Sequence, residues 1–103
     1  MAKKIEFTPD VTEIAQYGKA MSHPVRVYIL KKLSEMNACC YSGDLVNEIP
    51  VGRSSLSMHL KELKNAGLIQ GEVELPYIKY CLNRENWDKA KTVFKELFEN
   101  KSF

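Results

Sequence analysis

Apolar positions follow a helical spacing through the first third of the chain. Thr8-Pro9-Asp10 is typical of a helix start, because Thr can cap, Pro suits the first helical position and Asp favours the positive helix end. The apolar stripe after it consists of Val11, Ile14, Ala15, Gly18 and Met21. Ser22-His23-Pro24 then starts a second helix, which we expect His23 to cap. Its predicted buried face consists of Val25, Ile29, Leu30, Leu33 and Met36.

Two further helices follow, separated by a short interruption. We expect Ser42 to cap a short third helix that buries Leu45, Val46 and Ile49. Pro50-Val51-Gly52 breaks the helical pattern, since proline and glycine both oppose helix continuation. A fourth helix is predicted from Arg53 to Ala66, and Gly67 is expected to end it.

The pattern then changes to extended segments. Residues 68–74 and 77–83 read as two strands joined by a turn at Leu75-Pro76, with Ile78, Tyr80 and Leu82 on one side of the second strand. A last amphipathic helix carries Trp87, Ala90, Val93, Phe94, Leu97 and Phe98. The sequence therefore predicts a mainly α fold with a β-hairpin (α+β), in the order of four helices, hairpin and helix. This is a winged helix-turn-helix, expected to form one domain over residues 1–103.

The fourth helix has two contrasting faces. Leu56, Leu60 and Leu63 share one side and should pack on the core. The opposite side, which has no carboxylate, carries Ser54, Ser57, Met58, Lys61 and Asn65. Small hydroxyls let a helix sit deep in the major groove, and Ser and Lys can bond base edges or phosphates. Arg53 lies at the helix N-terminus, which already favours phosphate. An ordinary solvated helix face is the alternative.

The low net charge means that any binding of nucleic acid must depend on a local cationic surface. The chain has 15 Lys and Arg against 13 Asp and Glu, for a net charge of +2. A protein that held DNA by bulk charge alone would be more basic. Its cations must therefore gather on one surface, and a dimer would double that surface.

Two segments resemble the ArsR/SmtB family of bacterial repressors. Residues 53–69, from Arg53-Ser54-Ser55-Leu56 to Leu68-Ile69, resemble the family's recognition helix. Residues 22–30, beginning Ser22-His23-Pro24, resemble the opening of its second helix. The resemblance implies DNA contacts at Ser54, Ser57, Met58 and Lys61. The family has a longer polar or basic residue where Met58 stands.

The resemblance also implies a homodimer built from the first and last helices, which releases DNA when a ligand binds. The apolar residues on these helices are too many for so small a core. The expected dimer interface consists of Ile14, Met21, Phe94, Leu97 and Phe98.

The wing departs from the family, in which arginines occur at its tip. Here the tip reads Glu72-Val73-Glu74-Leu75-Pro76-Tyr77, and its two carboxylates repel phosphate. We expect only Lys79 to contribute a DNA contact from the wing.

The metal-sensing sites of the family are missing. Its arsenic and cadmium sensors carry a Cys-x-Cys pair at positions that are here Tyr41 and Gly43, and its zinc sensors need a histidine on the last helix. We therefore expect the protein to hold no metal ion, and DNA binding should need neither zinc nor arsenite. Adjacent Cys39 and Cys40 are unsuited to a mutual disulfide, and Cys81 should face away from the core side of its strand. All three are expected to be small hydrophobic residues or free thiols, with a redox or soft-metal sensor as the alternative.

The leading prediction is a sequence-specific transcriptional repressor of double-stranded DNA, cytoplasmic, with no cofactor and no membrane partner. A small-molecule or redox effector is left open. One alternative is a winged helix that binds protein through its last helix. Another is a thiol enzyme using Cys39 or Cys40, which lacks a histidine nearby in sequence. His59 is expected to be structural, with a phosphate contact as its alternative.

Overall fold

The computed structural model describes residues 6–36 and 39–100. Its elements are α1 (Pro9–Ala20), α2 (Pro24–Met36), β1 (Cys40–Tyr41), α3 (Ser42–Glu48), α4 (Arg53–Asn65), β2 (Ile69–Glu74), β3 (Tyr77–Leu82) and α5 (Arg84–Phe98). The predicted α+β winged helix is confirmed, with predicted bounds within one residue for α4, β2 and β3. Among these elements, no helix is both long and apolar enough to cross a membrane.

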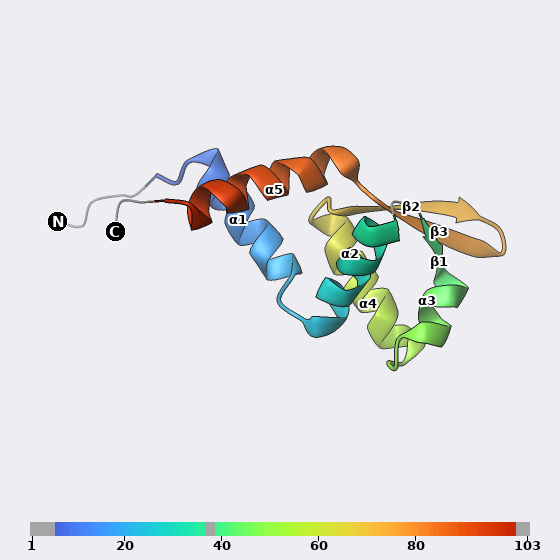
Figure 1. The fold of residues 1–103 in the computed structure, drawn as a ribbon. Helices are drawn as coiled ribbons and strands as arrows, with labels where there is room; N and C mark the ends of the chain where they lie inside the picture. The colour runs from blue at the N-terminus through green and yellow to red at the C-terminus, as the bar shows by residue number, and fades with distance from the viewer. Residues whose placement is uncertain (1–5, 37–38, 101–103) are drawn as a thin grey trace.

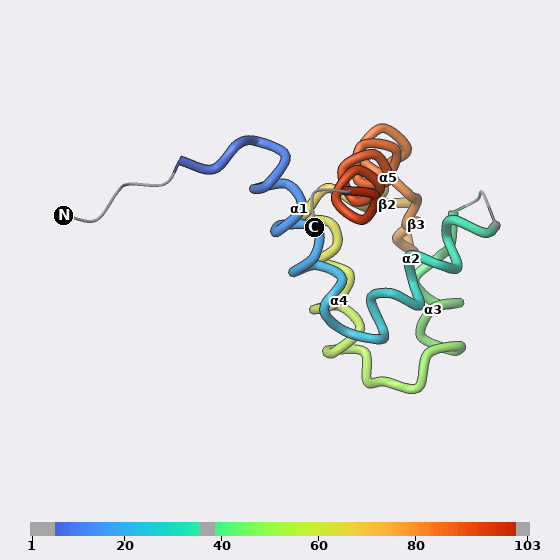
Figure 2. Tube along the Cα trace, turned by 60° about the vertical axis from the view of Figure 1, so that its left-hand side comes forward, coloured from blue at the N-terminus to red at the C-terminus, as the bar shows by residue number. Residues whose placement is uncertain are grey.

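The elements divide into two regions along the molecule. Figure 1 shows α1 and α5 side by side at one end and the β2–β3 hairpin projecting at the other, with α3 and α4 beneath. Figure 2, in which α5 is seen nearly along its axis, shows α2, α3 and α4 on one side of it. The winged helix and the α1–α5 pair therefore present separate surfaces.

One apolar core joins the helices to the base of the sheet. Its fully buried large side chains come from α2, α3, α4 and the start of the hairpin; they are Ile29, Leu33, Leu45, Leu56, Leu63, Leu68 and Ile69. Burial of each such side chain stabilises the fold by about 1.5–3 kcal/mol. The α2, α3 and α4 faces predicted from helical spacing supply most of this core.

The first helix is only partly as predicted. Ile14 and Met21 are half-buried, but Val11, Ala15 and Gly18 are exposed within one chain. The buried residues of α1 are instead Tyr17 and Ala20. The predicted stripe therefore overlaps the true contact face only at Ile14 and Met21.

Two predicted side-chain caps are wrong. Thr8 occupies the N-cap position of α1, yet its hydroxyl donates to the Asp10 carboxylate and accepts no hydrogen bond from a backbone N–H of the helix. Tyr41, not Ser42, is the N-cap of α3, and the Ser42 hydroxyl oxygen accepts the Ile78 N–H at 3.4 Å. Ser42 thereby ties α3 to β3.

The sheet contains a third strand that the sequence did not predict. Its order is β1-β3-β2, and both pairings are antiparallel. In β1, Cys40 pairs with Tyr80 and Tyr41 with Lys79. Two residues are too few to show an alternating pattern. The predicted Leu75-Pro76 turn is confirmed, because β2 and β3 pair from Ile69 opposite Leu82 to Glu74 opposite Tyr77.

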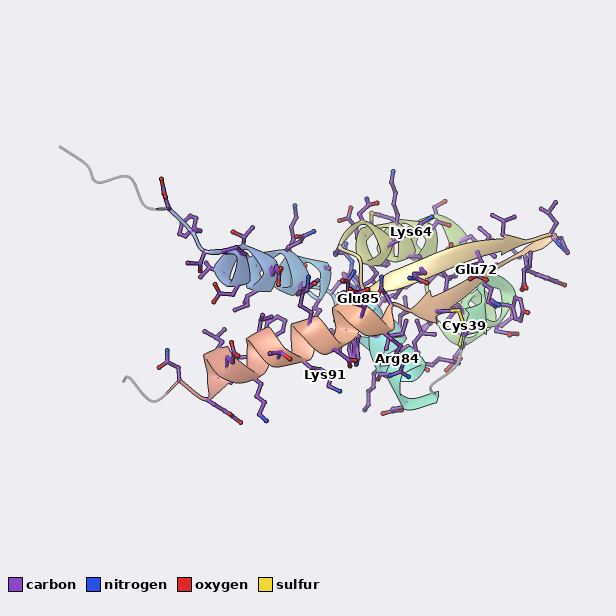
Figure 3. All side chains as sticks on the ribbon, turned by 90° about the horizontal axis from the view of Figure 1, so that it is seen from above. Cys39, Lys64, Glu72, Arg84, Glu85 and Lys91 are labelled. Atoms are coloured by element: carbon purple, nitrogen blue, oxygen red, sulfur yellow. A yellow bond between two sulfur atoms is a disulfide. The ribbon has the colours of Figure 1, made fainter. Side chains whose placement is uncertain are left out.

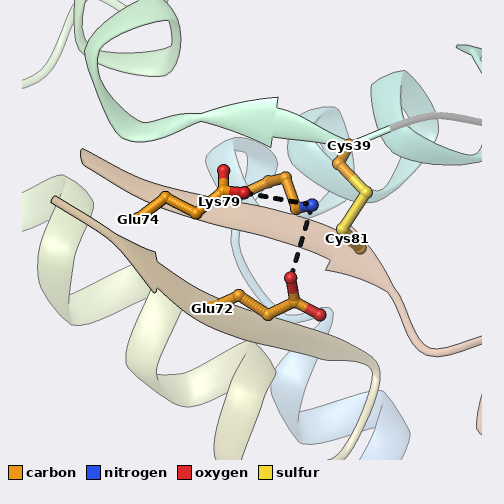
Figure 4. A network of polar contacts seen from close by, with 5 residues as sticks. All are labelled: Cys39, Glu72, Glu74, Lys79 and Cys81. Carbon is orange, nitrogen blue, oxygen red and sulfur yellow. Dashed lines mark ion pairs between the residues drawn. A yellow bond between two sulfur atoms is a disulfide. The ribbon is translucent and has the colours of Figure 1, made fainter.

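The prediction of three free thiols is wrong for two of them. The pairing of β1 with β3 brings Cys39 beside Cys81, and the two form a disulfide with their Cα atoms 4.3 Å apart (Figure 4). Cys81 is half-buried on β3, and its sulfur is bonded to the exposed Cys39. Cys40 is a free, buried cysteine.

Gly67 lies where the end of α4 contacts the start of α5. Its φ is +83°, the Gly67 N–H donates to the Lys64 carbonyl and the Leu68 N–H to the Leu63 carbonyl, which together form a Schellman cap. The Asn86 side chain donates to the Gly67 carbonyl at 2.8 Å, and the Asn86 N–H donates to the Asn83 side chain that caps α5. Asn86 thus links the C-terminal end of α4 to the N-terminal end of α5.

A Gly67→Ala substitution tests this junction. An added Cβ would lie 2.7 Å from the Asn86 Nδ2 atom, and the positive φ itself disfavours a side chain. We expect the free energy of unfolding to fall by at least about 1–2 kcal/mol in urea denaturation. Gly18→Ala, in open space on a helix, is the control and should raise it by about 0.5–1 kcal/mol. Equal effects of the two substitutions would contradict the account.

Candidate nucleic-acid interface

The exposed face of α4 gathers the residues that the sequence proposed for DNA contact. Leu56, Leu60 and Leu63 are buried on the opposite side. The exposed set, in which no carboxylate lies, consists of Arg53, Ser54, Ser57, Met58 and Lys61, continued by Lys64 and Asn65. Short serine side chains lie among the longer side chains of Arg53 and Lys61, so this face is positively charged and carries few bulky groups. Such a face suits entry into a groove.

The turn before α4 leaves the helix N-terminus open. Ile49 is buried, whereas Pro50 and Gly52 of the turn are exposed. Gly52 is the N-cap and supplies no side-chain hydrogen bond. The first intrahelical bond runs from the Leu56 N–H to the Gly52 carbonyl, so the preceding amides of the first turn have no helical partner. These amides and the exposed Arg53 together form an arrangement suited to a phosphate.

The cations on α4 are available for intermolecular contacts. Within the described ranges, no ion pair involves Arg53, Lys61 or Lys64. A shallow cavity of about 330 Å³ lies between this face and the hairpin, and Ser57, Lys61, Lys64 and Tyr80 help to line it. Figure 3 shows Lys64 extending outward from α4. Sequence reasoning missed Lys64, although its spacing of three residues from Lys61 was a usable signal.

Lys79 differs from these cations. It is half-buried on β3, and its ammonium lies 3.3 Å from the Glu72 carboxylate and 3.7 Å from that of Glu74 (Figure 4). The hydrogen bond and charge of Glu72, with the charge of Glu74, raise the pKa of Lys79. A DNA contact by Lys79 stays a prediction. It would require the ammonium group to break its ion pairs with Glu72 and Glu74 or to bind a phosphate in addition to them.

His59 holds the back of α4 against α2. Its side chain is only 3% exposed, and its Nδ1 accepts the Arg26 Nε–H at 3.0 Å. The His23 ring lies 4.2 Å away between centroids, and the His23 Nδ1 accepts the Val25 N–H at 3.1 Å, so the predicted cap at α2 is confirmed. The structural interpretation of His59 is therefore the one that the geometry supports.

The expected dimer residues fall into two groups. Ile14, Met21 and Phe94 are half-buried and pack against the core of their own chain. Leu97 is 44% exposed and Phe98 is 77% exposed, with the Phe98 ring stacked on Phe94 at 5.9 Å. Among the described residues, an exposed apolar surface thus exists at the end of α5, and Val11 is a further exposed apolar side chain on the neighbouring α1.

Comparison with known proteins places the winged-helix segment among bacterial regulators. Residues 23–70 match the family model described as bacterial regulatory protein, arsR family. The chain is 33% identical over 69 residues to the transcriptional regulator CmtR of Mycobacterium tuberculosis, a match that covers 67% of this chain. That match covers 57% of the relative, so the chain spans little more than half the length of this curated protein.

Two further comparisons extend over more of the chain. The transcriptional regulator YgaV of Escherichia coli is 26% identical over 98 residues, covering 95% of this chain and 98% of YgaV. The structure of an ArsR-like transcriptional regulator from Rhodococcus sp. RHA1 matches with a TM-score of 0.72 at 23% identity. It covers 87% of this chain and 83% of that one, and supports the fold.

The environment of His59 predicts a pH dependence of stability. Burial, followed by the charges of His23 and Arg26, lowers the pKa of His59 below its ordinary 6.5. The unfolded chain therefore takes up this proton first, so the stabilisation is present above pH 6.5 and is lost as pH falls toward the lower folded-state pKa. Protonation also removes the acceptor for Arg26.

Urea denaturation between pH 8 and pH 5 checks this expectation. His59→Gln keeps a side-chain acceptor for Arg26 but cannot titrate, so its stability should decline less than that of the unsubstituted protein below pH 6.5. Parallel pH profiles for the two proteins would show that His59 does not carry the effect.

Proposed function

We propose that this chain, which belongs to the ArsR/SmtB family of winged-helix regulators, binds double-stranded DNA in a sequence-specific way and represses transcription. The observation that carries the proposal is the exposed face of α4, where small hydroxyls and unpaired cations lie opposite a buried leucine face. The second helix of a helix-turn-helix enters the major groove. Here that helix is α4, preceded by α3.

The residues of this face divide between positioning and recognition. Arg53 and Lys61 bind phosphates, the first beside the open helix N-terminus. Ser54 and Ser57 reach base edges, and the exposed Met58 packs on a thymine methyl group. The wing contributes little charge, because Glu72 and Glu74 engage Lys79.

Two copies act together in this proposal. The apolar end of α5, with Leu97 and Phe98, joins α1 of a second copy, and this contact buries the two exposed side chains. The whole chain then serves as one winged-helix domain with dimerising terminal helices, working inside the cell where its DNA is. Two recognition helices would face half-sites one DNA turn apart, roughly 34–36 Å.

A thiol-responsive regulator is the second candidate, and the Cys39–Cys81 disulfide favours it. Disulfides in intracellular proteins commonly serve redox sensing. Cys39 is exposed, so a reductant can reach the bond. The bond ties the segment entering α3 to the wing strand β3, so its reduction would free the helix-turn-helix and the wing to move relative to each other.

Substitutions on α4 test the DNA interface. With duplex DNA from upstream of the protein's own gene, Ser57→Ala should weaken specific binding by about 1–3 kcal/mol if its hydroxyl reads a base. Lys61→Ala should weaken binding to all sequences and reduce the salt slope by about one. Lys91→Ala, on exposed α5, is the matched control and should change neither quantity. Unaltered affinity in both α4 variants would exclude α4 from the groove.

Sedimentation tests the dimer. A Leu97→Lys, Phe98→Lys variant should be monomeric at micromolar concentration where the unsubstituted chain is dimeric, since it places two cations in the apolar contact. Val73→Lys, an exposed apolar residue on the wing, is the control and should leave the dimer intact. A monomeric unsubstituted chain would contradict the proposal.

Reduction tests the second candidate. We expect the affinity for the upstream duplex to change severalfold when the disulfide is reduced. A Cys81→Ser variant should bind with the affinity of the reduced protein under both oxidising and reducing conditions. Closing a loop of this sequence separation, 42 residues, stabilises a fold by about 4 kcal/mol in the chain-entropy estimate, so the variant should also unfold at lower urea concentration. Cys40→Ser should still respond to reduction. Equal affinities in both redox states would remove this candidate.

A further inference from the structure

An open cavity of about 700 Å³ lies between the start of α3 and the tip of the wing. Tyr41 and Asp44 line it from the helix side, and Glu74, Leu75 and Tyr77 line it from the hairpin. The α4 surface described above does not contribute to it, so the cavity is separate from the proposed DNA interface.

Two tyrosine rings form the aromatic part of its wall. The centroids of Tyr41 and Tyr77 are 6.1 Å apart, and the ring planes are inclined by 66°. The rings thus meet edge to face, and a cation seated over a ring face that is left open would lie within about 6 Å of that ring's centroid, which is the range of a cation–π interaction. Gly43 lies beneath Tyr77, where an added Cβ would be 3.9 Å from the ring, so the ring rests close to α3.

The charge of the cavity wall is negative. Glu74 and Asp44 stand on opposite sides of it, and no lysine, arginine or histidine of the described ranges lines it. Glu74 accepts a hydrogen bond from the Tyr41 hydroxyl, which raises the pKa of Tyr41, and shares Lys79 with Glu72. Within the described ranges Asp44 has neither an ion pair nor a side-chain hydrogen bond. Lys79 is thus shared between Glu72 and Glu74, and the Asp44 carboxylate adds a further negative charge to the cavity wall.

We propose that this cavity binds a small organic ammonium cation against the aromatic wall formed by Tyr41 and Tyr77, with Asp44 and Glu74 as its counter-charges. The carboxylates exclude an anion. Ring faces and the apolar Leu75 suit alkyl groups on nitrogen better than the tightly held water of a metal ion. Among the described residues, no group of three or more His, Cys, Asp or Glu could hold a metal ion. Quaternary ammonium groups are the ligands that aromatic cages of this kind take.

Nuclear magnetic resonance of the full chain without DNA tests the site independently of DNA binding. Choline is the probe, and 3,3-dimethylbutan-1-ol, which has the same shape without the charge, is its neutral match. We expect saturable shifts of the amides of Tyr41, Gly43, Asn47 and Tyr77 with choline, and no saturable shift with the alcohol. Equal binding of the two compounds, or no saturable shift with choline, would overturn the proposal.

Variants separate the two parts of the site. Tyr77→Leu and Asp44→Asn should each raise the dissociation constant of choline about fivefold or more, whereas Tyr77→Phe, which keeps the ring, should retain binding. Glu96→Gln, an exposed carboxylate on α5, is the control for general charge and should bind as the unsubstituted chain does. Should Tyr77→Leu fail to fold, Asp44→Asn decides, because Asp44 is exposed. Unchanged dissociation constants in the variants that fold would overturn the site.

Discussion

Burial of one side of α4 is the constraint on which the rest of the molecule depends. Leu56, Leu60 and Leu63 enter the same core as side chains of α2 and α3, and each is at most 3% exposed. Because a helix is rigid, fixing these three side chains fixes the rotation of the whole helix about its axis. Ser57 and Lys61 must then point outward. Polar contacts refine this packing, through Arg26 and His59 at the middle of α4 and through Gly67 and Asn86 at its C-terminal end.

The distribution of charge explains how a chain with a net charge of only +2 can present a positive surface. Several lysines are neutralised within the molecule, among them Lys32 by Glu48, Lys79 by two wing carboxylates and Lys89 by Glu13. Among the described residues, Lys61 and Lys64 of α4 form no such ion pair. The wing, which is acidic and apolar, is consequently unsuited to phosphate and better suited to other ligands. The fold thus separates a cationic helix face from an anionic, aromatic wing tip.

Most of the fold could be predicted from the sequence, because the helices and the hairpin are long enough to repeat their patterns. The leucine spacing in α4 placed its two faces correctly, and Gly67 marked its end. The strand β1 could not be predicted, since Cys40 and Tyr41 offer no periodicity. The Cys39–Cys81 disulfide was missed as well, because the pairing of β1 with β3 is what brings the two cysteines together.

In the candidate site, residues on one helix were predictable and contacts between elements were not. Local spacing determines which residues share the face of α4. The pairing of Lys79 with Glu72 depends on strand register, and the meeting of Tyr41 with Tyr77 depends on how α3 lies beside the hairpin. The exposed apolar end of α5 was recognisable by composition, but the half-burial of Ile14, Met21 and Phe94 within their own chain was not.

The central claim is that α4 holds duplex DNA through phosphate contacts, and the salt dependence of binding tests it most directly. The measurement is the association constant for a duplex from upstream of the protein's own gene, determined over a range of salt concentrations. The account predicts that its logarithm falls linearly with the logarithm of salt concentration, because bound cations release counterions from the DNA. Binding that does not depend on salt, or no binding to duplex DNA at low salt, would contradict it.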